Sequence, residues 1–197
     1  MSERRTQAER RAETQAAVLD SAAKLFGEKG YAKTSLEDIA GHCGISIAPI
    51  YHYFGNKKNL FQAVNQAMEA RILAPENSTD DEFVLSRWRG FLDLCKDAHF
   101  RQIVLVDGPT VLGIERMSHS KTSAKMLERI EQRFAAHPIN PADGGESAAR
   151  APSYKSELVG RMIVGALAEA GLFIGSAGDP EQACQDADEL VTGLMQI

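Results

Sequence analysis

The feature that most constrains this chain is a pair of short helical stretches between Thr34 and Lys58, separated by one glycine. Gly44 breaks the first stretch, and a second begins almost at once, where we expect Ser46 to cap the helix. Pro49 falls in the first turn of that helix, where its missing amide does no harm. Two short helices joined by so tight a turn predict a helix-turn-helix, whose later helix is narrow enough for the DNA major groove.

The helices on either side of the second one carry start signals of their own. The letters TSLE, which start at Thr34, have the form of a capping box. We expect the Thr34 hydroxyl and the Glu37 carboxylate each to satisfy an end amide of a helix that ends by about Cys43. After the second helix, Asn56 is expected to cap a longer helix that reaches about Leu73.

The rest of the chain shows helical periodicity, and the alternation typical of half-buried strands is hard to find. An apolar stripe on the first helix ends at Gly30, where a left-handed cap is expected; its members are Val18, Ala22, Leu25 and Phe26. Further helices are expected from Thr79, which opens a second capping box, over about 110–136 with a bend near Gly113, and over about 154–176 and 181–196. The apolar stretch 101–106 should end at Asp107-Gly108-Pro109, and residues 137–153 are expected to form a flexible connection.

This pattern predicts an all-α protein with two parts. The first is an N-terminal three-helix helix-turn-helix domain over 1–58 with an N-terminal arm, and a helix over 56–73 connects it to a larger helical domain over 74–197. The arm carries Arg4, Arg5, Arg10 and Arg11. It either reaches toward the minor groove and nearby phosphates or is a solvated tail.

Composition limits the function. The 197 residues carry a net charge of −5, which excludes a protein that is basic throughout. Residues 1–58 nevertheless hold nine Lys and Arg against seven Asp and Glu, so the front end is the part that tolerates polyanions. Three scattered cysteines indicate neither a disulfide framework nor a zinc site, and no apolar run reaches the length of a membrane helix. We expect a cytoplasmic protein without a metal or cofactor.

The residues of the helix-turn-helix divide into a packing side and an outward side. Ile45 and Ile50 are apolar at spacings that face the domain core. The outward side is expected to read base edges with Ser46, Ile47, Ala48 and Pro49, and to meet phosphates with Tyr51, His52, Lys57, Thr34 and Ser35. Taken singly, most of these residues also have a plain structural explanation, such as capping or half-buried packing.

The order and spacing of these residues resemble the amino-terminal domain of the tetracycline-repressor-like (TetR) family of transcriptional regulators. The resemblance covers about residues 14–64, including Phe26, Gly30 and Tyr31, and is carried by the segments TSLEDIA from Thr34, CGIS, IYHYF and NKKNL. Beyond residue 64 it is architectural, through the length, the stretch 107–113 and the final helix pair.

The resemblance implies a homodimeric repressor that binds a near-palindromic operator and is released by a small molecule held in the larger domain. Residue by residue, the positions that match the family's DNA contacts are Thr34, Ser46, Tyr51, His52 and Lys57. Ile47 and Pro49 depart from the Lys and Thr that the family often has. That departure suggests an operator read partly through apolar contact with thymine methyl groups.

The closing helices, over about 154–176 and 181–196, are apolar on more than one face. An isologous four-helix interface between two copies would bury the surplus, and six small residues permit close approach; these are Gly160, Gly165, Ala166, Ala168, Gly171 and Gly175. We therefore expect a homodimer through these two helices.

The effector pocket is less sharply indicated. Its candidate lining is Trp88, Phe91, Cys95, His99, Met117, Met126, Met162 and Phe173. Met-rich apolar walls suit an adaptable cavity for a largely apolar effector, and His99 and His119 are the candidate polar groups. Core packing is the simpler explanation for each of the lining residues.

Two other classes compete with this interpretation. An all-α enzyme needs a positioned acid, base or nucleophile, and none of the familiar catalytic motifs is present in the sequence. A dimeric small-molecule-binding protein without promoter regulation remains the alternative. It would bind ligands but show no sequence-dependent affinity for duplex DNA.

Overall fold

The computed structural model describes residues 6–73, 80–113, 128 and 154–194. Within these ranges every regular element is a helix, so the predicted all-α class is confirmed. The elements are α1 (Gln7–Lys29), α2 (Leu36–Cys43), α3 (Ala48–Phe54), α4 (Lys57–Ala70), η1 (Arg71–Leu73), α5 (Asp80–Cys95), α6 (Ala98–Phe100), the π-helix η2 (Arg101–Asp107), α7 (Gly108–Leu112), α10 (Tyr154–Ser176) and α11 (Pro180–Leu194).

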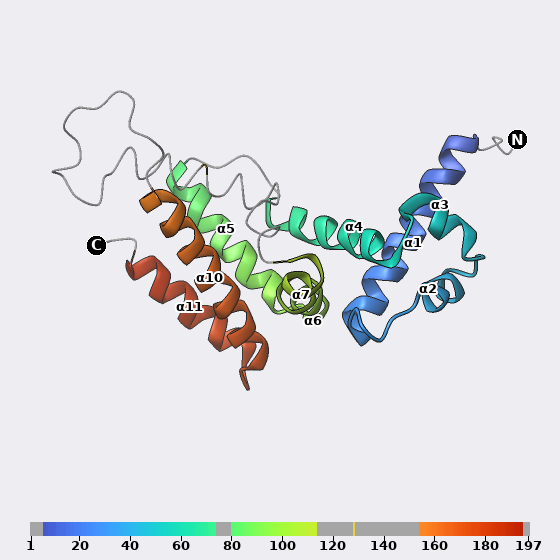
Figure 1. Cartoon of the computed structure of the whole chain (residues 1–197). Coiled ribbons are helices and arrows are strands. Elements are labelled where there is room, and N and C mark those ends of the chain that lie inside the picture. Colours follow the sequence, from blue (N-terminus) through green and yellow to red (C-terminus); the bar gives the residue numbers. More distant parts are fainter. Residues whose placement is uncertain (1–5, 74–79, 114–127, 129–153, 195–197) are drawn as a thin grey trace, which may run out of the picture.

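The helices form two groups. Helices α1 to α3 lie at one end of the molecule, and α5, α10 and α11 pack side by side at the other (Figure 1). Helix α4 runs from the first group toward the second, and the short run of α6, η2 and α7 lies between them (Figure 1). No helix in the described ranges is both long and apolar enough to cross a membrane.

The first group is built on the apolar stripe of α1. The side chains of Val18, Ala22, Leu25 and Phe26 are all buried, as predicted. Ile39, Ile50, Leu60 and Phe61 from the next three helices complete the core, and each is completely buried. Burying a side chain of this size stabilises the fold by about 1.5–3 kcal/mol. The core therefore fixes the angle between α2 and α3.

The start of α2 differs from the prediction by one residue. Ser35, not Thr34, is the N-cap: its Oγ accepts from the Asp38 amide (3.0 Å), and Asp38 Oδ2 accepts from the Ser35 amide (2.9 Å). The predicted pairing of Thr34 with Glu37 is wrong because Thr34 is buried, with 1% of its surface exposed. Its Oγ lies 2.9 Å from the Gly30 carbonyl and 3.1 Å from that of Leu25, so the hydroxyl closes the turn after α1.

Of the two further caps that the sequence predicts in the helix-turn-helix, one is correct. Asn56 caps α4, accepting from the Asn59 amide at 2.8 Å. Ser46 does not cap α3, because that helix begins two residues later and its N-cap, Ile47, makes no side-chain capping bond. Pro49 lies in the first turn of α3, where the sequence places it.

The first helix also differs from the prediction at its two ends. It begins at Gln7 with a capping box between Thr6 and Glu9, so Arg10 and Arg11 belong to the helix and not to an arm; Arg4 and Arg5 lie outside the described residues. At the other end Gly30 has φ 78° and ψ 163°, a positive φ but not the predicted left-handed helical conformation. The chain therefore leaves α1 in an extended direction.

The middle of the chain stays helical where the sequence predicts a break. Residues 101–107 form a π-helix that continues directly into α7, with Gly108 and Pro109 inside the run. Pro109 occupies the first turn of α7, where a proline is tolerated, so it does not end the helix. Helix α7 then stops at Leu112, before Gly113. The rest of the helix predicted to residue 136 and the connection 137–153 lie outside the described residues.

The last two helices agree closely with the prediction. Helix α10 spans Tyr154–Ser176, and α11 spans Pro180–Leu194. Helix α5 begins at Asp80, and its expected cap Thr79 is outside the described residues. Helix α10 packs against both α5 and α11. One face of the helix pair is thereby covered by α5.

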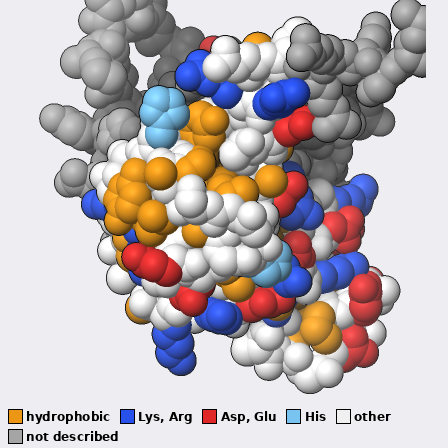
Figure 2. Space-filling view, turned by 90° about the vertical axis from the view of Figure 1, so that its right-hand side faces the viewer, with side chains coloured by type: hydrophobic (Ala, Val, Ile, Leu, Met, Phe, Trp, Pro, Cys, Tyr) orange, Lys and Arg blue, Asp and Glu red, His pale blue; other side chains and the backbone are white. Residues whose placement is uncertain are grey.

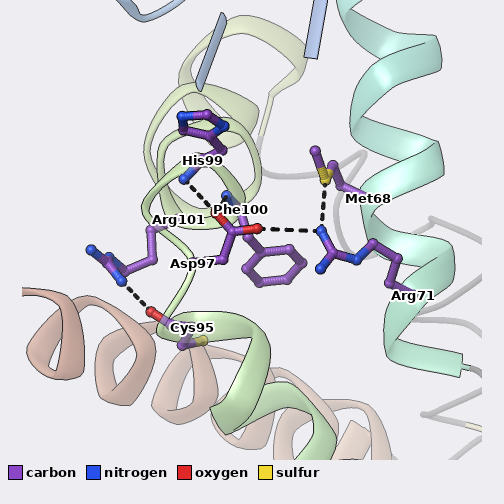
Figure 3. A network of polar contacts seen from close by, with 7 residues as sticks. All are labelled: Met68, Arg71, Cys95, Asp97, His99, Phe100 and Arg101. Atoms are coloured by element: carbon purple, nitrogen blue, oxygen red, sulfur yellow. Dashed lines mark hydrogen bonds and ion pairs between the residues drawn. The ribbon is translucent and has the colours of Figure 1, made fainter. Parts of the chain in front are cut away.

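The two groups of helices meet through specific polar contacts, which we call the junction. Asn65 of α4 is 3% exposed, and its Nδ2 donates to the Ile103 carbonyl of the π-helix at 3.2 Å. At the end of α4, Arg71 pairs with Asp97 at 3.4 Å, and Asp97 also caps α6 by accepting from the His99 and Phe100 amides (Figure 3). The junction therefore joins α4 to the larger part at two separate points.

Candidate nucleic-acid interface

The turn between α2 and α3 depends on one glycine. Gly44 adopts φ 68° and ψ 30°, the left-handed conformation, and the Ile45 amide then donates to the Ala40 carbonyl at 3.1 Å. A residue with a Cβ would cost about 1–2 kcal/mol in this conformation. The turn lets α3 begin only four residues after Gly44.

Helix α3 packs on one side and faces solvent on the other. Ile50 is completely buried and Ile45 is half-buried, as the sequence predicts. The side chains of Ser46, Ala48 and His52 are exposed, and Tyr51 is 51% exposed. Ile47 and Pro49 are half-buried at the edge of this face. The start of α3 and the turn before it are therefore accessible to a partner.

The end of the molecule that carries α2 and α3 is not strongly basic. A patch of hydrophobic side chains lies on it, with a histidine at the edge of the patch and basic and acidic side chains scattered around it (Figure 2). A surface of this kind suits contact with apolar groups such as thymine methyl groups, together with a few placed cations.

A hollow of about 390 Å³ lies beside α3, where the amino-terminal ends of α2 and α4 come together. Its lining includes Lys33, Ser35, Glu37, Tyr51, Asn56 and Lys57. The first amides of a helix lack intrahelical partners and attract anions. The hollow thus brings two helix ends, two lysines and a phenol to one place, with the Glu37 carboxylate as the opposing charge.

The groups in the hollow are not equally free to bind. The Ser35 amide and hydroxyl both donate to Asp38, so they are already used within the protein. An anion in the hollow would contact the amides that follow Ser35 in α2. These two hydrogen bonds hold the pKa of the Asp38 carboxyl below its ordinary value, with smaller contributions from Lys29 and Lys57. The ammonium of Lys57 lies 4.2 Å from the centre of the Tyr31 ring.

Of the nine residues predicted to contact DNA, eight lie around α3 and this hollow with some exposed surface. Thr34 is the exception, because its side chain is buried and its hydroxyl is already hydrogen-bonded within the protein. We therefore leave Thr34 out of the candidate contacts. The feature that sequence reasoning misses is the pair of residues Tyr31 and Asp107, whose only signal in the sequence is the position of Tyr31 after Gly30.

Some of the residues predicted to line the effector pocket are buried and others are exposed. Trp88, Phe91 and Cys95 of α5 are buried, and the two aromatic rings are stacked with centres 6.5 Å apart. Among the described residues, no hydrogen-bond partner reaches the buried Trp88 indole nitrogen. Met162 and Phe173 of α10 are 65% and 63% exposed, so the structure does not bury them together with these three residues.

Of the remaining predicted pocket residues, the structure describes only His99. His99 packs against Gly27 of α1, where an added Cβ would collide with the imidazole ring. It therefore belongs to the junction rather than to the core of the larger part. Met117, Met126 and His119 are outside the described residues. Within the described ranges no three His, Cys, Asp or Glu side chains are grouped to hold a metal ion.

The outer face of the closing helices carries large apolar side chains in contact with solvent. These are Leu158, Met162, Leu172 and Phe173 on α10 and Leu190 on α11. Four of them expose between 59% and 69% of their surface. Few soluble proteins leave so many large apolar groups together on one face without a partner for it.

Comparison with known proteins gives matches at both ends of the chain. Residues 18–64 match the family model described as bacterial regulatory proteins, tetR family, and residues 82–196 match the tetracyclin repressor-like C-terminal domain. The HTH-type transcriptional regulator YezE of Bacillus subtilis is 42% identical over an alignment of 143 residues, and the match covers 66% of this chain and 71% of that protein.

Two other similar proteins agree with these matches. The negative transcriptional regulator IcaR of the Staphylococcus aureus biofilm operon icaADBC is 42% identical over 45 residues, 23% of this chain and 24% of IcaR. A TetR-family transcriptional regulator from Pectobacterium atrosepticum has a similar solved structure. Its TM-score is 0.61 at 28% sequence identity, and the match covers 96% of this chain and 95% of the other.

Proposed function

The chain belongs to the tetR family of bacterial regulatory proteins and is a transcriptional regulator, and we propose that it is a repressor that binds a near-palindromic operator as a homodimer. A small, largely apolar effector releases it from the DNA. In this proposal residues 1–58 are the DNA-binding domain, the helix over 56–73 connects, and residues 74–197 bind the effector and form the dimer.

The observation that carries the proposal is the outward face of α3 beside the hollow at the starts of α2 and α4. In a major groove, the exposed Ser46 and Ala48 and the edge formed by Ile47 and Pro49 meet base edges and thymine methyl groups. Ser35, Tyr51, His52 and Lys57 flank this face, around the hollow and the exposed surface of α3. In this proposal these four side chains contact the DNA phosphates and so fix the register of α3 in the groove.

The exposed apolar face of α10 and α11 supports the dimer. A second copy placed by two-fold symmetry would bury Leu158, Met162, Phe173 and Leu190 of both chains in a four-helix interface. The two α3 helices would then be held in a fixed relation. Half-sites one helical turn apart, or a multiple of it, follow from that symmetry.

Release by an effector is supported by the junction. A ligand in the larger part lowers operator affinity only if it binds one arrangement of the dimer better than the other, typically by about 1–3 kcal/mol. Trp88 offers a buried indole N–H that no other described group uses. That donor is the polar group expected to orient an otherwise apolar effector. A change in the larger part would reach α4 through the contacts of the junction.

The decisive experiment is selection of bound fragments from random duplex DNA with the purified full chain. Recovery of a two-fold symmetric sequence supports the proposal. A protein that takes up apolar ligands but enriches no sequence would instead be the dimeric ligand-binding protein without promoter control. Sedimentation of the free protein tests the dimer: the expected mass is that of two chains, and Phe173→Glu should shift it toward one.

Binding to a selected fragment then tests individual contacts. Lys57→Ala should weaken binding to all sequences and reduce the slope of log K against log salt by about one. Lys96→Ala removes the same charge just beyond the end of α5 and should leave the slope unchanged. Ser46→Ala should act on sequence preference, and a uniform loss across operators would argue against base reading at that position.

A further inference from the structure

Tyr31 lies where the core, the hollow and the larger part of the molecule meet. Its ring stacks on Phe26 with centres 5.8 Å apart and meets Phe61 edge-on at 5.0 Å. Both of those phenylalanines are completely buried. The ring of Tyr31 is therefore held on two sides by completely buried side chains of the domain core.

The open face of the ring is occupied by Lys57. The Lys57 ammonium lies 4.2 Å from the ring centre, a distance at which the negative face of the ring attracts a cation. Lysine otherwise carries a flexible four-carbon stem whose ammonium samples many positions. Because Lys57 also lines the hollow, the ring holds the ammonium at the place where an anion would enter. Burial raises the pKa of the Tyr31 phenol, so the ring stays uncharged.

The backbone of Tyr31 is held from the larger part. Its amide donates to Asp107 Oδ2 at 2.8 Å, and the same oxygen accepts from Gln102 Nε2 at 3.0 Å. Asp107 is the last residue of the π-helix, 76 positions further along the chain. The corner at Gly30 lets the two segments come this close, with the Asp107 oxygen 3.6 Å from where a Cβ would lie.

These contacts form one continuous path from the π-helix to the hollow. We infer that Tyr31 is a positioning residue that holds the Lys57 ammonium for a DNA phosphate, and that Asp107 sets this position from the larger part. The inference rests on the proposed function, in which Lys57 meets a phosphate. It gives the larger part a contact to Lys57, at the start of α4, that does not run along the length of that helix.

The first test compares two substitutions of Tyr31 on a short mixed-sequence duplex, with Lys57→Ala alongside. Tyr31→Phe keeps the ring and should bind as the unsubstituted protein does. Tyr31→Leu keeps an apolar side chain but loses the ring face, and should weaken binding about two- to fivefold, the loss expected for an exposed cation–π contact. Tyr31→Leu combined with Lys57→Ala should be no weaker than Lys57→Ala alone.

Thermal unfolding of each variant separates positioning from stability, because a purely structural role would lower the melting temperature without changing the slope of log K against log salt. If Tyr31→Leu leaves both affinity and slope unchanged while Lys57→Ala reduces them, the positioning role is overturned. If Lys57→Ala itself changes nothing, the proposed phosphate contact fails instead. The two failures are therefore distinguishable.

The second test concerns Asp107. Asp107→Asn keeps a carbonyl oxygen that accepts both hydrogen bonds, since both use the same carboxylate oxygen, and should bind DNA normally. Asp107→Ala should weaken binding to a similar extent as Tyr31→Leu. Gln102→Ala is the matched control that removes only the neighbouring bond, and should have no effect on DNA.

A variant that does not fold would not decide the question. Asp107→Glu serves in that case, because it keeps the charge but displaces the accepting oxygen by one methylene. Normal DNA binding by a folded Asp107→Ala or Asp107→Glu protein would overturn the role of Asp107.

Discussion

Gly30 is a position where the backbone conformation favours glycine. Its φ of 78° and ψ of 163° lie in a region that is essentially reserved for glycine. Placing alanine there stores strain of about 1–3 kcal/mol. The added Cβ itself meets no close obstacle, since the nearest atom is the Gln102 side-chain nitrogen at 3.4 Å. The cost of Gly30→Ala is therefore conformational.

Part of that cost is offset in the unfolded chain. Alanine has fewer accessible conformations than glycine, which by itself stabilises the folded state by about 0.4–1 kcal/mol. At the middle of both ranges the difference leaves a net destabilisation of about 1.3 kcal/mol, and it is at most about 2.6 kcal/mol. At about 2–4 °C per kcal/mol for a chain of this size, the middle value corresponds to a fall in melting temperature of roughly 3–5 °C.

Gly41 provides the matched control. It lies inside α2 without a positive φ, and no atom lies within 4 Å of the position that an added Cβ would take. Gly41→Ala should therefore stabilise the protein by about 0.5–1 kcal/mol. Urea and thermal unfolding, followed by circular dichroism, measure both variants. Equal or greater stability of Gly30→Ala, with the expected gain for Gly41→Ala, would refute the conformational argument.

Three other outcomes follow from the described contacts. Thr34→Val keeps the shape of the side chain but removes the buried hydroxyl, and should lower the free energy of unfolding in urea by about 1 kcal/mol. The salt dependence of DNA binding should not change. A changed slope of log K against log salt would return Thr34 to the candidate DNA contacts. Alkylation followed by mass spectrometry should label the half-buried Cys43 well before Cys95, whose pKa burial raises to about 12. The pKa of the Asp38 carboxyl is lower in the folded protein than in the unfolded chain. Its contribution to stability is therefore present above the pKa of the unfolded chain and is lost as the pH falls through the pKa of the folded protein. NMR titration should find the midpoint of Asp38 below that of an unpaired Asp.

The helix-turn-helix is predictable because its signals are local. Gly44, Pro49 and the cap at Asn56 each act within one turn of helix, and each lies where the sequence indicates. The error at the start of α2 is also local. Thr34 and Ser35 are both good caps, and only the packing of α1 against the turn decides that Thr34 is buried and Ser35 starts the helix.

The effector pocket is harder to predict because a buried apolar residue looks the same whether it packs against protein or lines a cavity. The pattern on α10 is apolar around much of its circumference, so periodicity alone does not say which face turns inward. That pattern places Met162 and Phe173 in a pocket, yet they lie on the outer face. Their exposure is what supports the proposed dimer.

Two contacts between the groups of helices, those of Asn65 and Asp107, are invisible in the sequence for a different reason. Asn65 donates to a backbone carbonyl and Asp107 accepts from a backbone amide, so the partner in each hydrogen bond is a group that nearly every residue carries. No pairing of side-chain types marks such a contact. The same chemistry has a consequence for the proposed function: residues that face an effector could change without disturbing these contacts, provided that Asn65 and Asp107 and the backbone they bind stay in place. In the proposed mechanism, specificity for the ligand and control of the DNA-binding end are then separable.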